Sequence, residues 1–190
     1  MSKKSKTYVQ RAVNKQKMSD IELATLIFEY RNQSDHGTAL IGASYLDFRL
    51  TEALVAFLVD DKDAVQGFLS YSFAYRTKLA YMVGLVNRDV RDAMDRIRDI
   101  RNHFAHEWSG ASFEQPPITG WIKEMLQVPN IGPQLLMDQN ENILFKSATA
   151  NRFAYISAVF VLATSFRAIA SHLRHRVCVL PFSKRSKNHG

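Results

Sequence analysis

The stretch RDIRNHFAHEW, residues 98 to 108, concentrates side chains that could act on a phosphodiester. A histidine titrates near neutral pH, so His106 could accept or donate the proton of a ribose 2′-hydroxyl or of a leaving oxygen. The guanidinium of Arg101 could hold two phosphate oxygens while charge develops on them. This chemistry needs no metal ion. The stretch therefore predicts either a phosphodiesterase site or a helix end that simply carries cations in its last turn.

The candidate catalytic set consists of Arg101, Asn102 and His106. Asn102 and His106 are four residues apart, so on a helix the amide could orient the imidazole. Arg101 and His106 are five residues apart, or about 140° around a straight helix, and could not reach one phosphate together. The helix must therefore end or distort near residues 104 to 108, or two subunits must combine their motifs.

Arg98 and His103 are further candidates, for binding RNA or phosphate beside this set. His103 falls near Arg96 and Asp99 on the helix, so a solvent-exposed side chain without a function is its alternative interpretation. Arg101 continues the apolar stripe of the helix. It either extends along the edge of that stripe toward water or lies partly buried beside an anionic partner.

The helix that carries these residues is expected over 88–106, with Asn87 as its N-cap. Acids and arginines alternate on its surface at three- and four-residue spacings, each pair contributing about 0.2 to 0.5 kcal/mol. The apolar residues fall within one arc at the helical period, and they are Val90, Ala93, Met94, Ile97, Ile100 and Phe104. This arc is expected to face the core.

Helical spacing also dominates the rest of the chain, and no alternating run indicates a strand. A first helix is expected from Ser19, where SDIE forms a capping box. Gly84 and Met82 are expected inside a helix, Gly84 to allow close approach of a neighbour and Met82 in the core. The other expected elements are long helices over 38–58, 72–86 and 147–174, short ones over 65–69 and 121–126, and a loop over 107–120. The sequence predicts an all-α bundle of four long helices plus short accessory helices.

The net charge of +7 resides at the ends of the chain. Residues 1–17 hold six Lys/Arg, residues 174–190 hold five, and neither segment holds an acid. The rest of the chain holds 14 Lys/Arg and 18 Asp/Glu, so its net charge is −4. We therefore predict a single helical domain over 18–176, between a basic tail over 1–17 and another over 177–190. The tails could bind polyphosphate loosely or serve only for solubility.

Several function classes are not indicated by the sequence. Cys178 is the only cysteine, which excludes an internal disulfide and suits a reducing compartment. No metal-ligand cluster, P-loop, dinucleotide turn or G-x-S-x-G motif occurs, and the N-terminus lacks the apolar segment of a secretory signal. The longest apolar run, 153–166, is shorter than the roughly 20 residues that span a bilayer. We predict a cytoplasmic protein with no metal, small-molecule cofactor or membrane contact.

The stretch RNHFAH resembles the R-x(4–6)-H motif of the HEPN superfamily, with Arg101, Asn102 and His106 at the motif positions. HEPN proteins are helical bundles and often dimers. Their active members are metal-independent endoribonucleases in which two motifs meet at the dimer interface. The resemblance implies a HEPN-like bundle, a homodimer and an RNA substrate.

A longer resemblance, over about 40–170, is to the mannitol operon repressor (MtlR-like) family. It rests on SYLDFRLTEALVAFLVDD and RTKLAYMVGLVNRDVRDAMDRIRDIRN. The residues that match a characteristic block of that family are Arg76, Lys78, Leu79, Tyr81, Gly84, Val86 and Asn87. The resemblance implies a transcriptional regulator. No helix with a basic face follows a tight turn, so contact with a protein partner or RNA is expected in place of a helix-turn-helix.

The sequence and these resemblances leave two functional hypotheses and a third in which the chain is only structural. The first is an MtlR-like regulator that acts through protein partners or RNA. The alternative is a metal-independent HEPN endoribonuclease, a toxin or defence effector, with Arg101 and His106 at its centre. A purely structural helical module would need neither.

Overall fold

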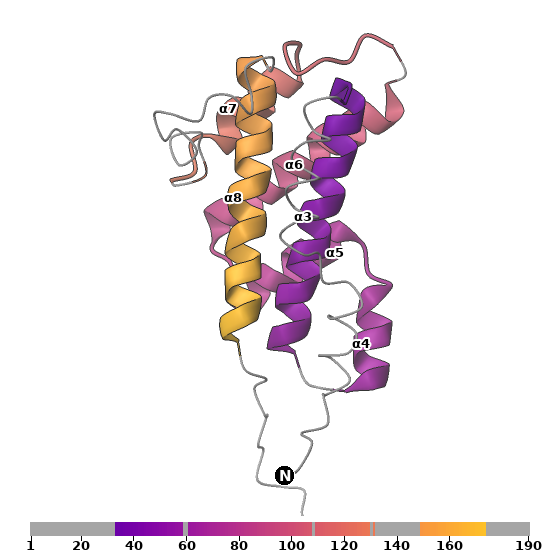
Figure 1. Ribbon diagram of the computed structural model, residues 1–190, viewed down its shortest axis with the longest axis vertical. Coiled ribbons are helices and arrows are strands. Elements are labelled where there is room, and N and C mark those ends of the chain that lie inside the picture. The colour runs from indigo at the N-terminus through magenta and orange to yellow at the C-terminus, as the bar shows by residue number, and fades with distance from the viewer. Residues whose placement is uncertain (1–32, 59–60, 108, 130, 132–148, 174–190) are drawn as a thin grey trace, which may run out of the picture.

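The computed structural model describes residues 33–58, 61–107, 109–129, 131 and 149–173 (Figure 1). Within these ranges the chain forms only helices and no strand, which confirms the all-α class. The helix expected from Ser19 and both basic tails lie outside the described residues. The six helices are α3 (Asp35–Phe57), α4 (Lys62–Leu69), α5 (Phe73–Met82), α6 (Arg88–His106), α7 (Ile118–Met125) and α8 (Ala150–His172).

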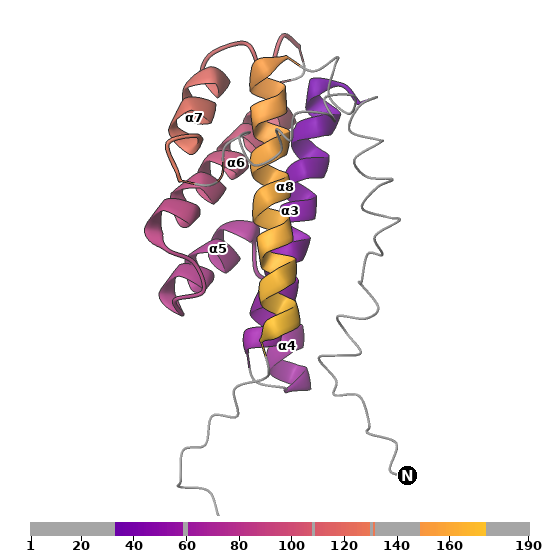
Figure 2. The same cartoon turned by 60° about the vertical axis from the view of Figure 1, so that its left-hand side comes forward.

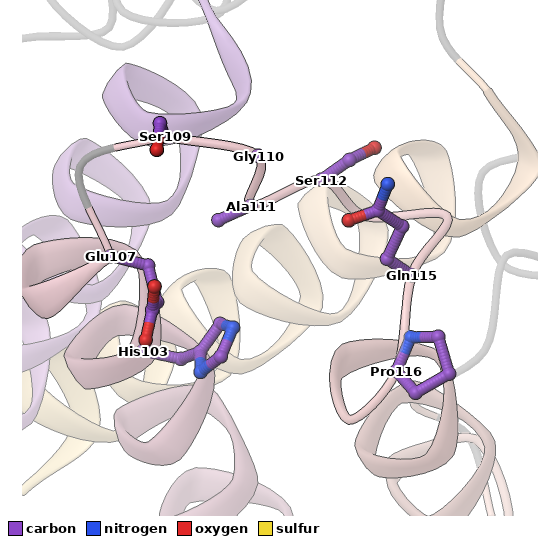
Figure 3. A pocket seen from close by; sticks show the side chains of 8 residues that line it. All are labelled: His103, Glu107, Ser109, Gly110, Ala111, Ser112, Gln115 and Pro116. Atoms are coloured by element: carbon purple, nitrogen blue, oxygen red, sulfur yellow. The ribbon is translucent and has the colours of Figure 1, made fainter.

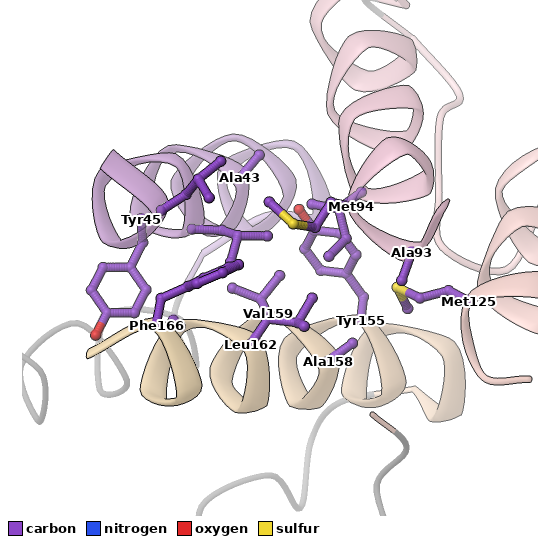
Figure 4. Packing of buried hydrophobic residues seen from close by; sticks show 14 of the residues in the cluster. Ala43, Tyr45, Ala93, Met94, Met125, Tyr155, Ala158, Val159, Leu162 and Phe166 are labelled. Atoms are coloured by element: carbon purple, nitrogen blue, oxygen red, sulfur yellow. The ribbon is translucent and has the colours of Figure 1, made fainter. Parts of the chain in front are cut away.

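Three long helices build the bundle. α3 and α8 lie side by side along the long axis of the molecule, and α6 crosses them diagonally (Figures 1 and 2). α5 and α7 both pack against α6. The core between these helices is apolar, and Figure 4 shows Met94 of α6 near Tyr155 of α8, with Val159, Leu162 and Phe166 following along α8. The described helices thus share one core.

α6 has the bounds that its sequence predicts. The side chain of Asn87 accepts a hydrogen bond from the backbone N–H of Val90 and caps the helix. The buried residues are Ala93, Met94, Ile97, Ile100 and Phe104, and Val90 is half-buried against them. Local signals were sufficient here because the cap and the apolar arc agree.

α3, α7 and α8 occur where long or short helices are expected, with shifted ends. α3 begins three residues before 38, because the Ser34 side chain accepts from the backbone N–H of Gly37 and caps an earlier turn. Thr149 caps α8 in the same way, bonding the N–H of Arg152. α4 extends the short helix expected over 65–69 back to Lys62, after the N-cap Asp61.

The helix expected over 72–86 is shorter, and Gly84 is the reason. α5 ends at Met82, and Gly84 has φ +73°. The Gly84 N–H bonds the carbonyl of Tyr81 and the Leu85 N–H bonds that of Ala80, the pattern that closes a helix with a left-handed residue. A Cβ at Gly84 would meet nothing within 4 Å, so the expected close helix approach is wrong. Met82 is 70% exposed, which also corrects its placement in the core.

Replacing Gly84 with alanine is expected to lower the free energy of unfolding by about 1 to 2 kcal/mol, because an L side chain is strained at positive φ. Chemical denaturation of Gly84→Ala against the wild type measures this. Gly67→Ala in α4 is the matched control, since a Cβ there also meets open space and φ is not positive. An unchanged Gly84→Ala stability would contradict the role of this residue as helix terminator.

A charged pair lies inside the bundle on α3. Arg49 is 2% exposed and its Nη1 donates to Oε2 of Glu52 at 2.6 Å. Its Nε donates to the hydroxyl of Tyr45 at 3.1 Å, and Nη2 has no hydrogen-bond partner among the described residues. Burial disfavours the charged form, but the bonds to Tyr45 and Glu52 outweigh this and raise the pKa of Arg49. The guanidinium therefore stays charged in the core.

α8 extends well beyond the apolar run expected over 153–166. It has 23 residues and an 18-residue window of mean hydropathy 1.7, so by length and composition it could cross a membrane. It is the one described helix of that kind. Half of that window is buried inside the bundle, as in the core helix of a globular domain. The cytoplasmic location stays a prediction.

Candidate functional site

Three helix ends meet where the RNHFAH stretch ends. The N-termini of α3 and α8 lie beside the C-terminus of α6, at the upper end of Figure 1. The loop after α6 turns back over them and inserts Phe113, which is fully buried. The Phe113 ring lies 4.9 Å from the ring of Phe104 and 5.1 Å from that of Tyr155. We call this region the helix-end junction.

Polar contacts fix the loop in the helix-end junction. Asp35 accepts from the Phe113 N–H through Oδ2 at 3.2 Å and pairs with Nη1 of Arg152 through Oδ1 at 3.2 Å. Glu114 accepts from the side-chain amide of Asn151 at 2.8 Å and from its backbone N–H at 3.4 Å. A carboxylate at the first turn of α8 also complements the helix dipole. The loop is therefore joined to both α3 and α8.

A histidine outside the predicted set closes the C-terminus of α6. The His36 Nε2–H donates to the backbone carbonyl of Glu107 at 2.7 Å. Its ring meets that of Phe104 edge-on, with centroids 5.1 Å apart. This contact satisfies one of the carbonyls that a helix end leaves free. His36 thus positions the end of the helix on which the candidate residues lie.

Arg101 lies exposed on α6, and among the described residues it has no ion pair with the anionic partner that one interpretation expected. Its Nη1 donates to Oδ1 of the neighbouring Asn102 at 3.0 Å. The other alternative, a side chain that reaches the edge of the apolar stripe and points to water, agrees with this position. The amide of Asn102 is therefore engaged by Arg101, and no bond from it to His106 occurs within the described part of the chain.

His106 is exposed in the last turn of α6. The helix remains regular through this residue, and Glu107 follows as its C-cap. α6 thus ends inside the range 104–108, where an end or a distortion was expected, but it ends only after His106. Arg101 and His106 are therefore five positions apart on one helix, which corresponds to about 140° of rotation and about 7.5 Å of rise. A single subunit does not bring the two side chains to one phosphate.

Arg98 and His103 differ in their surroundings. Arg98 pairs with Asp95 at 2.6 Å and with Asp99 at 3.1 Å, so two carboxylates compete with any phosphate for its guanidinium. His103 is half-buried, and its ring meets that of Trp121 edge-on at 5.9 Å. This ring contact departs from the interpretation of His103 as a freely solvated side chain.

A polar cavity of about 300 Å³ lies beside His103. His103 and Glu107 line one side, and Ser112 and Gln115 of the loop line the other (Figure 3). Neither Arg101 nor His106 lines this cavity. No group of three or more His, Cys, Asp or Glu side chains that could hold a metal ion occurs among the described residues.

The sequence reasoning missed most of the helix-end junction. Asp35, His36 and Arg152 look like ordinary polar residues near helix starts. Phe113 offered a signal, because a lone large apolar residue within a Gly-, Ser- and Pro-rich loop has to be buried somewhere. The sequence did not predict that the ends of α3, α6 and α8 enclose the Phe113 ring.

Comparison of the chain with protein-family models, with curated proteins and with solved structures found no match.

Proposed function

We propose that this chain is an MtlR-like regulator with a HEPN-like helical bundle, which acts by contacting a protein partner or RNA and does not cleave phosphodiesters. The observation that carries the proposal is the regular course of α6 through His106. Hydrolysis of a phosphodiester needs the acid–base group and the anion-binding group within about 3 Å of shared reacting atoms. Arg101 and His106 point in different directions from one helix, so a subunit alone lacks this constellation.

The cavity beside His103 supports the same conclusion. It lies beside the motif, and neither Arg101 nor His106 lines it. Phe104, at the centre of RNHFAH, is buried against His36 and Phe113. The motif thus contributes to joining three helix ends. A protein that only binds a partner can use the helix-end junction as a rigid surface. A nuclease would also need the side chains of Arg101 and His106 to reach the same phosphate.

Genetic complementation tests the regulator. Deletion of the gene in the source organism is expected to change the abundance of a defined set of transcripts. A chain with Arg101→Ala and His106→Ala together is expected to restore that set, because the proposal assigns no catalytic step to either side chain. Phe113→Ala, which removes the buried anchor of the junction, is expected to fail. A folded Arg101→Ala/His106→Ala chain that restores nothing would contradict the proposal.

The endoribonuclease is a second candidate because the guanidinium of Arg101 differs in its contacts from the other arginines of α6. Arg91, Arg96 and Arg98 of the same helix each pair with an aspartate. Arg101 instead bonds the neutral amide of Asn102, so its charge is available to an anion. Two subunits could combine Arg101 of one with His106 of the other. A homodimer is therefore a requirement of this candidate.

Incubation with a mixed RNA pool in the presence of EDTA separates the two functions. The regulator is expected to leave RNA intact at all protein concentrations. Cleavage that leaves 2′,3′-cyclic phosphate ends, lost in His106→Ala and Arg101→Ala, would establish the endoribonuclease instead. His172→Ala is the matched control, because His172 is also exposed in the last turn of a helix but lies outside the motif.

A further inference from the structure

The described residues include five exposed large apolar side chains, all within residues 69–82. They belong to the end of α4, the turn after it, and α5, and they are Leu69, Tyr71, Tyr75, Tyr81 and Met82. We call them the α5 surface. α5 lies at one side of the bundle (Figure 2) and packs inward on α3 and α6. Grouped apolar side chains on a surface mark contacts with macromolecules, and Tyr and Met are enriched in such contacts.

The rings of the α5 surface are held in place before any partner binds. The Tyr71 and Tyr75 rings contact each other, with centroids 4.4 Å apart. The guanidinium of Arg91 lies 4.7 Å from the centre of the Tyr81 ring and also pairs with Asp92. Side chains that are already ordered lose little entropy on binding. The α5 surface is thus suited to association.

α5 has a buried inner side and an exposed outer stripe. Thr77 and Ala80 are buried on the inner side. Tyr75, Lys78 and Met82 are all exposed, and their spacing of three and four residues aligns them on one face. Tyr71 precedes the N-cap Ser72, and its ring contact with Tyr75 adds it to the same stripe.

We propose that this stripe pairs with the same stripe of a second copy of the chain, with the two α5 helices antiparallel about a two-fold axis. The stripe residues Tyr71, Tyr75, Lys78 and Met82 are separated by four, three and four positions. This order reads the same in both directions. A two-fold interface requires this symmetry. If residue i of one subunit contacts residue j of the other, then residue j of the first must also contact residue i of the second.

The register places complementary groups opposite each other. Tyr75 faces Lys78 of the partner subunit, and an ammonium over a tyrosine ring forms a cation–π contact. Tyr71 faces Met82 of the partner subunit, and a thioether beside a ring is also favourable. Symmetry forms each contact twice. α5 contains no acidic residue, and in this pairing the ring supplies the partner that the Lys78 charge requires.

The size of the α5 surface sets the strength of the dimer. The five side chains of the α5 surface, three of which belong to the stripe, expose on the order of 400 to 500 Å² per subunit, since a whole tyrosine has roughly 200 Å². Stable interfaces use about 800 Å² per partner. We therefore expect a weak, concentration-dependent dimer with a micromolar dissociation constant. The dimer rests on the stripe of Tyr71, Tyr75, Lys78 and Met82, and it does not depend on whether the chain is a regulator.

Sedimentation velocity over the micromolar range tests the pairing. Lys78→Glu is expected to raise the dissociation constant about tenfold, because two cation–π contacts are lost. Tyr75→Lys is expected to abolish the dimer by placing like charges opposite each other. Tyr75→Lys combined with Lys78→Glu is expected to restore it, since each lysine then faces a glutamate. Lys123→Glu on α7, also exposed, is the control and is expected to have no effect. A wild-type chain that remains monomeric throughout this range would overturn the proposal.

Disulfide cross-linking tests the register in a Cys178→Ser background. Mixed Tyr71→Cys and Met82→Cys chains are expected to form cross-linked dimers on oxidation. Each variant alone is expected not to, because equal positions are about 16 Å apart along antiparallel helices and a disulfide needs Cα atoms within about 7 Å. Efficient cross-linking of either variant alone would overturn the antiparallel register. A monomer that binds single-stranded RNA through Tyr75 would overturn the dimer and assign the rings to base stacking.

Discussion

Replacing Glu52 with alanine is expected to lower the free energy of unfolding by about 3 to 5 kcal/mol. The substitution removes the carboxylate that Nη1 of Arg49 contacts at 2.6 Å and leaves a charged guanidinium in the core. The hydroxyl of Tyr45 would remain as a hydrogen-bond partner of Arg49, and a neutral hydroxyl does not compensate a buried charge. Chemical denaturation followed by circular dichroism measures the loss, at one fixed protein concentration.

A double variant separates the cost of an orphaned charge from a loss of packing. Arg49→Met combined with Glu52→Leu removes both charges and keeps the core filled, so its stability is expected to be near that of the wild type or above it. Asp92→Ala breaks an exposed pair with Arg91 and is expected to leave stability nearly unchanged. A Glu52→Ala chain as stable as Asp92→Ala would contradict the buried pair.

The buried pair shows where sequence reasoning stops in α3. Arg49 and Glu52 are three residues apart, a spacing that also describes a solvated pair on a helix surface. Only the enclosure of α3 by other elements decides between the two, and this is a tertiary property. The same enclosure buries Tyr45 and Leu54 of α3 and leaves Phe48 only partly buried.

Local signals explain both the success at α6 and the error at α5. Asn87 begins α6, and an uninterrupted apolar arc continues to Phe104. In α5, Gly84 is followed by Leu85 and Val86, so the apolar pattern passes through the glycine. A glycine inside such a pattern is compatible with a helix interior or with a helix end. The positive φ that decides for the end depends on hydrogen bonds back to α5.

The candidate site was predictable in its residue types and less so in its geometry. The spacing of Arg101 and His106 predicts that one regular helix keeps them apart, and α6 is regular through His106. The supporting contacts join residues that are 78 positions apart for Asp35 and Phe113, and 117 for Asp35 and Arg152. Without aligned relatives, nothing in a single sequence pairs positions at that separation.

Replacing Phe113 with alanine is expected to lower the free energy of unfolding by about 3 to 5 kcal/mol, the range for a fully buried aromatic residue. The ring contacts Phe104 and Tyr155, and its removal leaves a cavity between three helix ends. Phe113→Leu keeps most of the volume and is expected to cost less than about 1.5 kcal/mol. Denaturation of both variants gives the comparison.

The same substitution is expected to release the loop before the bundle unfolds. Three contacts attach the loop to the bundle here: the buried Phe113 ring, the Phe113 N–H that donates to Asp35, and Glu114, which accepts from Asn151 of α8. Losing the ring removes the apolar contact and leaves only the hydrogen bonds. Protease cleavage near Gly110 and amide exchange of the loop should therefore increase at denaturant concentrations where α6 remains protected. Equal loss of protection in the loop and in α6 would mean that the junction and the core unfold as one unit. In that case the loop is part of the fold, and the cavity between His103 and Gln115 could not change shape independently of α6.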